Sequence, residues 1–85
     1  MEKLESFRKS INSIDKQITK LLLKRFWIAK NISLYKEKSR IAVRDSKREA
    51  QVLKNIEEFS GKDKFIIGIF KKIISHSRNI QKWKK

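Results

Sequence analysis

A single apolar stripe runs through the first forty residues, and neither proline nor glycine interrupts it. Its members recur at intervals of three and four residues, which is the spacing of one face of an α-helix. The stripe consists of Leu4, Phe7, Ile11, Ile14, Ile18, Leu21, Ile28, Ile32 and Tyr35. We therefore predict one helix from about Glu2 to about Lys38. A helix of this length exceeds what one small core can cover, and its heptad spacing indicates a second long helix beside it.

Cations lie at or beside registers of this stripe where apolar side chains are expected. Arg25 continues the stripe, and Arg8 and Lys36 each follow an apolar member by four residues. Near the C-terminus, Gln81 shares a helical face with Ser77. A charge at a core position costs free energy unless another group pairs with it. Because guanidinium groups match carboxylates bidentately, we predict that a small ligand with carboxylate groups pairs with these cations.

Length and composition exclude several classes of protein. The 85 residues suffice for one domain, which we predict to span residues 1–85, and a core this small is commonly completed by oligomerisation. With no cysteine and one histidine, the sequence has no thiolate or histidine-cluster metal site. The net charge of +14 attracts nucleic acid, membrane surfaces and anionic metabolites alike. The apolar runs are too short to cross a bilayer and no signal peptide is recognisable, so we expect a cytoplasmic protein without a membrane partner.

Two shorter helices are expected after the first. The second opens at Asp45 or Ser46 and ends at Ser60, where the following Gly61 is a stop signal. The third begins near Asp63, which fits an N-cap, and carries its own apolar stripe. The sequence therefore predicts an all-α fold of three helices with a long first helix.

Distances along the first helix constrain how the cations can meet. Arg8 and Arg25 are seventeen residues apart, which is about 25 Å along a helix and too far for both to hold one small ligand. Arg25 and Lys36, about 16 Å apart, can approach opposite ends of one ligand. If Arg8 joins the same site, it comes from a second subunit that runs antiparallel. A twofold dimer then contains two equivalent sites, each built from both chains.

Further polar residues fall on the inward faces of the other two helices. Asp45, Arg48 and Glu49 occupy positions i, i+3 and i+4, on the side of the second helix that carries its apolar residues. Ser77 and Gln81 lie about one turn apart on the third helix. Polar groups on inward faces indicate a lined pocket.

These residues also have structural interpretations, which stay open at this point. Asp45 fits an N-cap, and Ser46 together with Glu49 fits a capping box. Arg25 could form an ion pair with Asp15 or Glu49 of either chain. The cations beside the stripe fit side chains that extend past it into solvent. The polar residues of the third helix fit an ordinary polar interface.

Four segments, taken in order, resemble the all-helical chorismate mutases. They are residues 7–15 (FRKSINSID), 21–29 (LLLKRFWIA), 43–49 (VRDSKRE) and 77–81 (SRNIQ). Each segment alone is a weak indication, whereas the ordered set with matching gaps is specific and covers about residues 4–83. Lys36 stands where that family carries the lysine that contacts the substrate's ether oxygen. Ala42 departs from the pattern, because several relatives carry proline there.

The resemblance implies an intertwined antiparallel homodimer that rearranges the chorismate dianion to prephenate, in aromatic amino acid biosynthesis, without cofactor or metal. The substrate-binding residues it implies are Arg8 of the partner subunit, Arg25, Lys36, Asp45, Arg48, Glu49, Ser77 and Gln81. The catalytic residues it implies are Lys36, Gln81, Glu49 and Arg25. In that family Lys36 and Gln81 would donate hydrogen bonds to the ether oxygen, where negative charge grows. Glu49 would accept one from the ring hydroxyl.

Two other functions remain to be weighed. Isochorismate pyruvate lyases share the fold and the cationic pocket, but the forms that we compare lack the acidic Asp-x-x-Arg-Glu segment and the serine. Glu49 and Ser77 therefore favour the mutase. A small basic helical module that binds nucleic acid would present its cations on an exposed face. The cations that match the family's site positions are predicted to face inward, so we expect no nucleic-acid partner.

Overall fold

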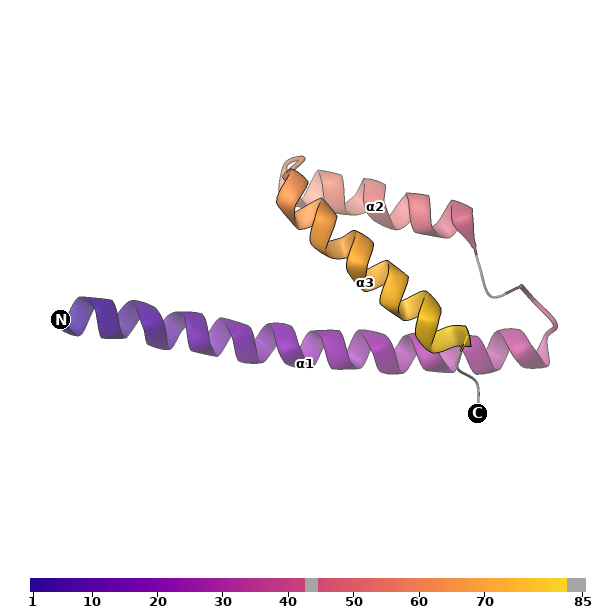
Figure 1. Cartoon of the computed structure of the whole chain (residues 1–85), viewed down its shortest axis with the longest axis horizontal. Coiled ribbons are helices and arrows are strands. Elements are labelled where there is room, and N and C mark those ends of the chain that lie inside the picture. Colours follow the sequence, from indigo (N-terminus) through magenta and orange to yellow (C-terminus); the bar gives the residue numbers. More distant parts are fainter. Residues whose placement is uncertain (43–44, 83–85) are drawn as a thin grey trace.

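In the computed structural model, which describes residues 1–42 and 45–82, every regular element is a helix (Figure 1). Helix α1 spans Glu2–Lys38, α2 spans Ser46–Ser60 and α3 spans Lys64–Lys82. The prediction of three helices with a long first helix is confirmed. Val43 and Arg44 of the VRDSKRE segment lie outside the described residues, as do residues 83–85.

Side chains at the helix ends explain where α2 and α3 begin. Asp45 Oδ1 accepts a hydrogen bond from the backbone N–H of Arg48 at 3.0 Å, so Asp45 is the N-cap of α2. Asp63 Oδ1 accepts bonds from two backbone N–H groups at the start of α3, at 2.9 and 3.0 Å. Gly61 ends α2 in the left-handed conformation, with φ of 67°. Because the cap is Asp45, Ser46 is the first helical residue, and the capping box that starts at Ser46 is not formed.

Helix α1 ends without a glycine. The backbone N–H of Ile41 donates to the carbonyl of Lys36 at 2.8 Å, and Arg40 takes the left-handed conformation with φ of 57°. This is the bonding pattern of a Schellman end. The turn therefore closes on Lys36, a residue that the sequence assigns to the candidate site.

Helix α3 connects the other two helices, because it packs against both α1 and α2 (Figure 1). The buried side chains among the described residues come from α1 and α3 and are Ala29, Ser33, Ile73, Ile74 and Ser77. Small side chains on α1 let the backbone of α3 come close, and Ser33 Oγ donates to the backbone carbonyl of Gln81 at 3.1 Å. The core of one chain is therefore small and lies where α1 and α3 meet.

The first half of α1 stands clear of the other two helices (Figure 1). The Cα radius of gyration is 16.3 Å, against about 12 Å for a compact domain of this length. The apolar stripe of this half is 40 to 65% exposed at Leu4, Phe7, Ile11, Ile14, Ile18 and Leu21. No described helix of the chain covers it. None of the helices, as far as the structure describes them, is long and apolar enough to cross a membrane.

Candidate active site

A cavity of about 250 Å³ is lined by residues of all three helices. Six of the eight predicted site residues line it, namely Arg25, Lys36, Arg48, Glu49, Ser77 and Gln81. Apolar side chains complete the wall, contributed by Ile28, Ala29, Ile32, Val52 and Ile74. Pockets for drug-sized ligands measure about 300 to 1,000 Å³. The volume therefore suits a smaller molecule, of the size of a metabolite.

Arg25 is held in this cavity by the hydroxyl group of Ser77. Its Nη1 donates to Ser77 Oγ at 2.7 Å, and the same hydroxyl donates to the backbone carbonyl of Ile73 at 2.9 Å. Ser77 is only 7% exposed, and its hydroxyl makes both of these bonds at the cavity wall. Among the described residues no carboxylate pairs with Arg25, so the structure shows neither Asp15 nor Glu49 of the same chain as its ion-pair partner.

The charge of Arg25 is partly desolvated. Burial lowers the pKa of its guanidinium group from the ordinary value, and the nearby positive charge of Arg48 lowers it further. The guanidinium stays protonated at neutral pH all the same. The lowered pKa reflects mainly the free-energy cost of burying this charge and, to a smaller extent, the repulsion from Arg48, and an anionic ligand would offset both.

Lys36 and Gln81 reach the cavity from the last turns of α1 and α3. The Oε1 atom of Gln81 is buried and has no hydrogen-bond partner among the described residues. A buried polar atom without a partner costs free energy, so native structures rarely retain one without a reason. The open position is an acceptor, and a half-turn of the amide places its NH₂ donors there instead, so the side chain suits a ligand as its partner.

Glu49 is bound bidentately by Arg78, a residue that the sequence analysis does not single out. Arg78 Nη2 donates to Glu49 Oε1 at 2.8 Å, and Arg78 Nε donates to Glu49 Oε2 at 3.1 Å. Hydrogen bonding of Arg78 to the Glu49 carboxylate, which accepts, is the main reason why the pKa of Arg78 is raised above its ordinary value. Both side chains line the cavity, and each is about one-quarter exposed, at 24 and 22%. The pair joins α3 to α2 at the cavity wall.

The position of Arg78 in the helical repeat could have identified it from the sequence as an inward-facing residue. It follows the buried Ile74 by four residues and precedes Gln81 by three, so it lies on the inward side of α3. The same reasoning singles out Arg25 in the first helix. The SRNIQ segment matches the family pattern only at its first and last residues, so the match gives no indication of Arg78.

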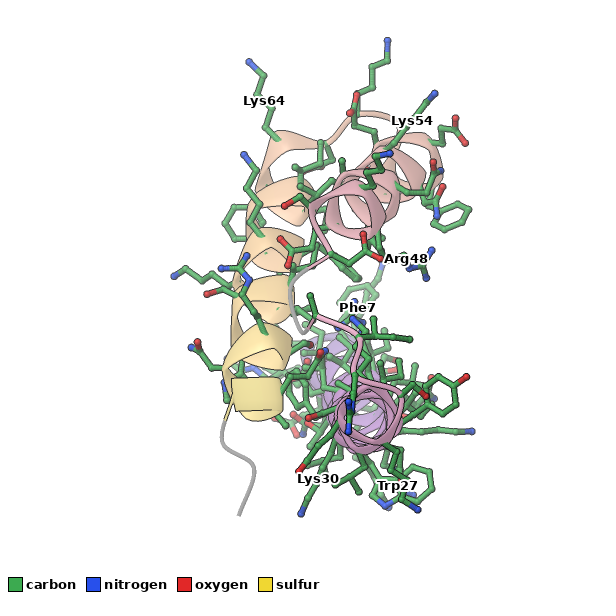
Figure 2. The ribbon with its side chains drawn as sticks, turned by 90° about the vertical axis from the view of Figure 1, so that its right-hand side faces the viewer. Phe7, Trp27, Lys30, Arg48, Lys54 and Lys64 are labelled. Atoms are coloured by element: carbon green, nitrogen blue, oxygen red, sulfur yellow. The ribbon has the colours of Figure 1, made fainter. Side chains whose placement is uncertain are left out.

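The remaining two predicted site residues do not line the cavity. Arg8 is exposed in the first half of α1, with Nη1 3.9 Å from Glu5 Oε1. It is about 25 Å along the helix from Arg25. Asp45 is exposed and acts as the N-cap of α2. Arg48, by contrast, lies on the side of α2 that faces α1 (Figure 2).

Comparison with known proteins gives one consistent family. The family model described as chorismate mutase type II matches residues 7–82. A chorismate mutase of Methanocaldococcus jannaschii is 33% identical over 86 residues, which cover 96% of this chain and 87% of the relative. Bifunctional chorismate mutase/prephenate dehydratases of Buchnera aphidicola subsp. Baizongia pistaciae and subsp. Schizaphis graminum are 38% and 37% identical over 83 residues. These matches cover 93% of this chain but 22% of each bifunctional relative. No solved structure matches the chain significantly.

Proposed function

The chain belongs to the chorismate mutase type II family, and we propose that it rearranges chorismate to prephenate in the cavity between its three helices. The observation that carries the proposal is the convergence of Arg25, Lys36 and Arg48 on one small cavity. These three cations come from two helices, and one of them is partly desolvated with no carboxylate partner among the described residues. A compact dianion such as chorismate supplies the missing negative charge.

The chemistry asks little of the protein beyond binding and electrostatics. The rearrangement is unimolecular, so the enzyme must hold a compact conformer and stabilise the charge that develops on the ether oxygen. In this proposal Arg25, fixed by Ser77, binds a carboxylate of the substrate. Lys36 and the amide of Gln81 donate to the ether oxygen. A preorganised donor adds no reorganisation cost at the moment of reaction, which is the basis of its catalytic effect.

Glu49 and Arg48 have the other roles at the cavity. The Glu49 carboxylate accepts a hydrogen bond from the ring hydroxyl of the substrate, and the Arg48 charge helps to balance the bound dianion. Asp45 contributes as the N-cap of α2. By fixing where the helix starts, it sets the register that places Arg48 and Glu49 at the cavity. This division of roles follows the family resemblance, and the positions of Arg48 and Glu49 support it.

A second copy of the chain completes the proposed site. The exposed stripe on the first half of α1 is what a partner helix of the same sequence can cover when it runs antiparallel. The excess of the radius of gyration over that of a compact domain supports this, because the chain buries too little apolar surface alone. In such an intertwined homodimer, Arg8 of the partner subunit reaches the cavity that holds Arg25. The dimer thus supplies a further carboxylate-binding cation.

The activity is tested by incubating the purified protein with chorismate and following the loss of chorismate absorbance. We expect prephenate as the product and loss of the rate in Arg25→Ala. Lys24→Ala serves as a matched control, because Lys24 is an exposed cation at the adjacent position of α1. Release of pyruvate would indicate a lyase, and absence of any product from the wild type would refute the proposal.

The shared site is tested by mixing two inactive variants. Arg8→Ala and Arg25→Ala homodimers each lack one arginine in both sites. After co-refolding, one site of every heterodimer receives both native arginines, so part of the activity should return. A monomer in sedimentation, or no recovery after co-refolding, would contradict the intertwined dimer.

A further inference from the structure

We propose that Arg78 is a positioning residue, which holds the Glu49 carboxylate in the orientation that accepts the substrate's ring hydroxyl. This inference rests on the proposed function and assigns a role to a residue outside the predicted site. Its basis is the bidentate pair between the two side chains at the cavity wall.

The geometry of the pair fixes Glu49 in two directions at once. Two bonds of 2.8 and 3.1 Å join separate nitrogen atoms of Arg78 to separate oxygen atoms of Glu49. A fork of this kind defines the plane of the carboxylate as well as its position, which a lysine or a single bond does not do. The orientation of Glu49 is therefore set before a ligand enters.

Arg78 does not use up the capacity of Glu49 to accept hydrogen bonds. An ionised carboxylate offers about four lone-pair positions on its two oxygens. The pair with Arg78 occupies one position on each oxygen. Arg78 therefore binds the carboxylate without occupying every acceptor position of either oxygen, so this pair does not by itself exclude a ligand hydroxyl from Glu49.

A purely structural role explains the pair less well. The two side chains are about one-quarter exposed, and partly exposed ion pairs add little to stability because solvent screens them. The bond does connect α2 to α3, but apolar side chains of both helices also line the same cavity wall. The position of the pair at the cavity is better explained by an effect on ligand contact than by an effect on folding.

The charges around Glu49 indicate what happens when Arg78 is removed. Arg25 and Lys36 of α1 and Arg48 of α2 share the cavity with it, and all three are cations. Without Arg78 positive charge remains at the cavity, but the two bonds that define the plane of the carboxylate are lost. A carboxylate that loses a hydrogen-bonded cation is also protonated more easily. We therefore expect both a lower rate and a change at acid pH.

The experiment compares Arg78→Met, Arg78→Lys and the control Lys71→Met. Lys71 is exposed on the same helix, two turns away, and its replacement removes the same charge. We expect Arg78→Met to lower kcat/KM by at least about tenfold, the scale of one charge-assisted contact. The acid limb of its kcat/KM profile should move to higher pH. Arg78→Lys should recover part of the pH profile but less of the rate, and Lys71→Met should match the wild type.

A double-mutant cycle with Glu49→Gln separates positioning from other effects. If Arg78 acts through the Glu49 carboxylate, Arg78→Met costs little in the Glu49→Gln background. An equal loss in both backgrounds, or wild-type kcat/KM at every pH in folded Arg78→Met, would overturn the inference while leaving the proposed function intact. Circular dichroism and thermal melting identify a variant that fails to fold, and Arg78→Lys then carries the test. An inactive wild type would overturn both proposals.

Discussion

Replacing Ser77 with alanine tests how Arg25 is held in the cavity. Ser77 Oγ accepts the N–H of Arg25 at 2.7 Å and directs its own proton to the carbonyl of Ile73. In this structure the serine therefore supports the arginine and does not offer its proton to the cavity. We expect Ser77→Ala to loosen Arg25, and to weaken substrate binding through it.

The size of the effect follows from the type of bond. A hydrogen bond to a charged group contributes about 1.5 to 3 kcal/mol. Because Arg25 is only part-buried, the lower end applies. About 1.4 kcal/mol corresponds to a tenfold change in rate or affinity. We therefore expect kcat/KM to fall about tenfold, with most of the change in KM, because the proposed contact of Arg25 with a substrate carboxylate is the same in the ground state and the transition state.

The assay is chorismate turnover by Ser77→Ala, with Ser75→Ala as the matched control. Ser75 is exposed on the same helix and should be replaced without loss. In the Arg25→Ala background, assayed at raised enzyme concentration, Ser77→Ala should have little further effect. A tenfold loss that persists there would show that Ser77 contacts the substrate directly. A kcat/KM within twofold of wild type in the single variant would refute the reasoning altogether.

Two further predictions concern Lys36 and Gln81, the proposed donors to the ether oxygen. Lys36→Ala should lower kcat by at least about a hundredfold, as for loss of an oxyanion donor; a rise in KM alone would contradict that role. Gln81→Glu should confine activity to acid pH, because a carboxylic acid donates only while protonated, near a reference pKa of about 4.3. If folded Gln81→Glu equals the wild type in kcat/KM at pH 8, then Gln81 does not contact the breaking bond.

The helices were predictable from the sequence because local chemistry sets them. The uninterrupted stripe predicts α1 with its observed bounds, and Asp63 and Gly61 mark the ends of their helices through bonds and a φ angle that only a few residue types provide. The sequence alone does not decide between two residues for the start of α2. Asp45 and Ser46 both fit a cap by type, and only the bond from Arg48 N–H decides for Asp45.

The sequence predicts most of the polar residues that line the cavity, but not which of their side chains pair with one another. Register alone places Arg25, Lys36 and Gln81 on inward faces, and the cavity contains all three. Register does not say which carboxylate pairs with which cation. The sequence leaves Glu49 as a possible partner of Arg25, whereas the structure pairs Glu49 with Arg78 from a helix 29 residues further along the chain. Such pairing depends on the crossing of α2 and α3, which no local pattern specifies.

The proposed dimer explains two features together, the excess of positive charge in the cavity and the exposure of the apolar stripe. Four cations line the cavity against the single acid Glu49, so the described lining carries three positive charges in excess (four minus one). Their repulsion works against the folded state, and a dianionic ligand offsets two of these charges, so ligand binding should stabilise the fold. A chain of 85 residues can place charges at its centre only if apolar burial is provided elsewhere. In the proposed dimer the stripe on the first half of α1 would provide this burial, and the same contact would bring Arg8 of the partner subunit to the cavity. Completion of the core and completion of the site are then one event.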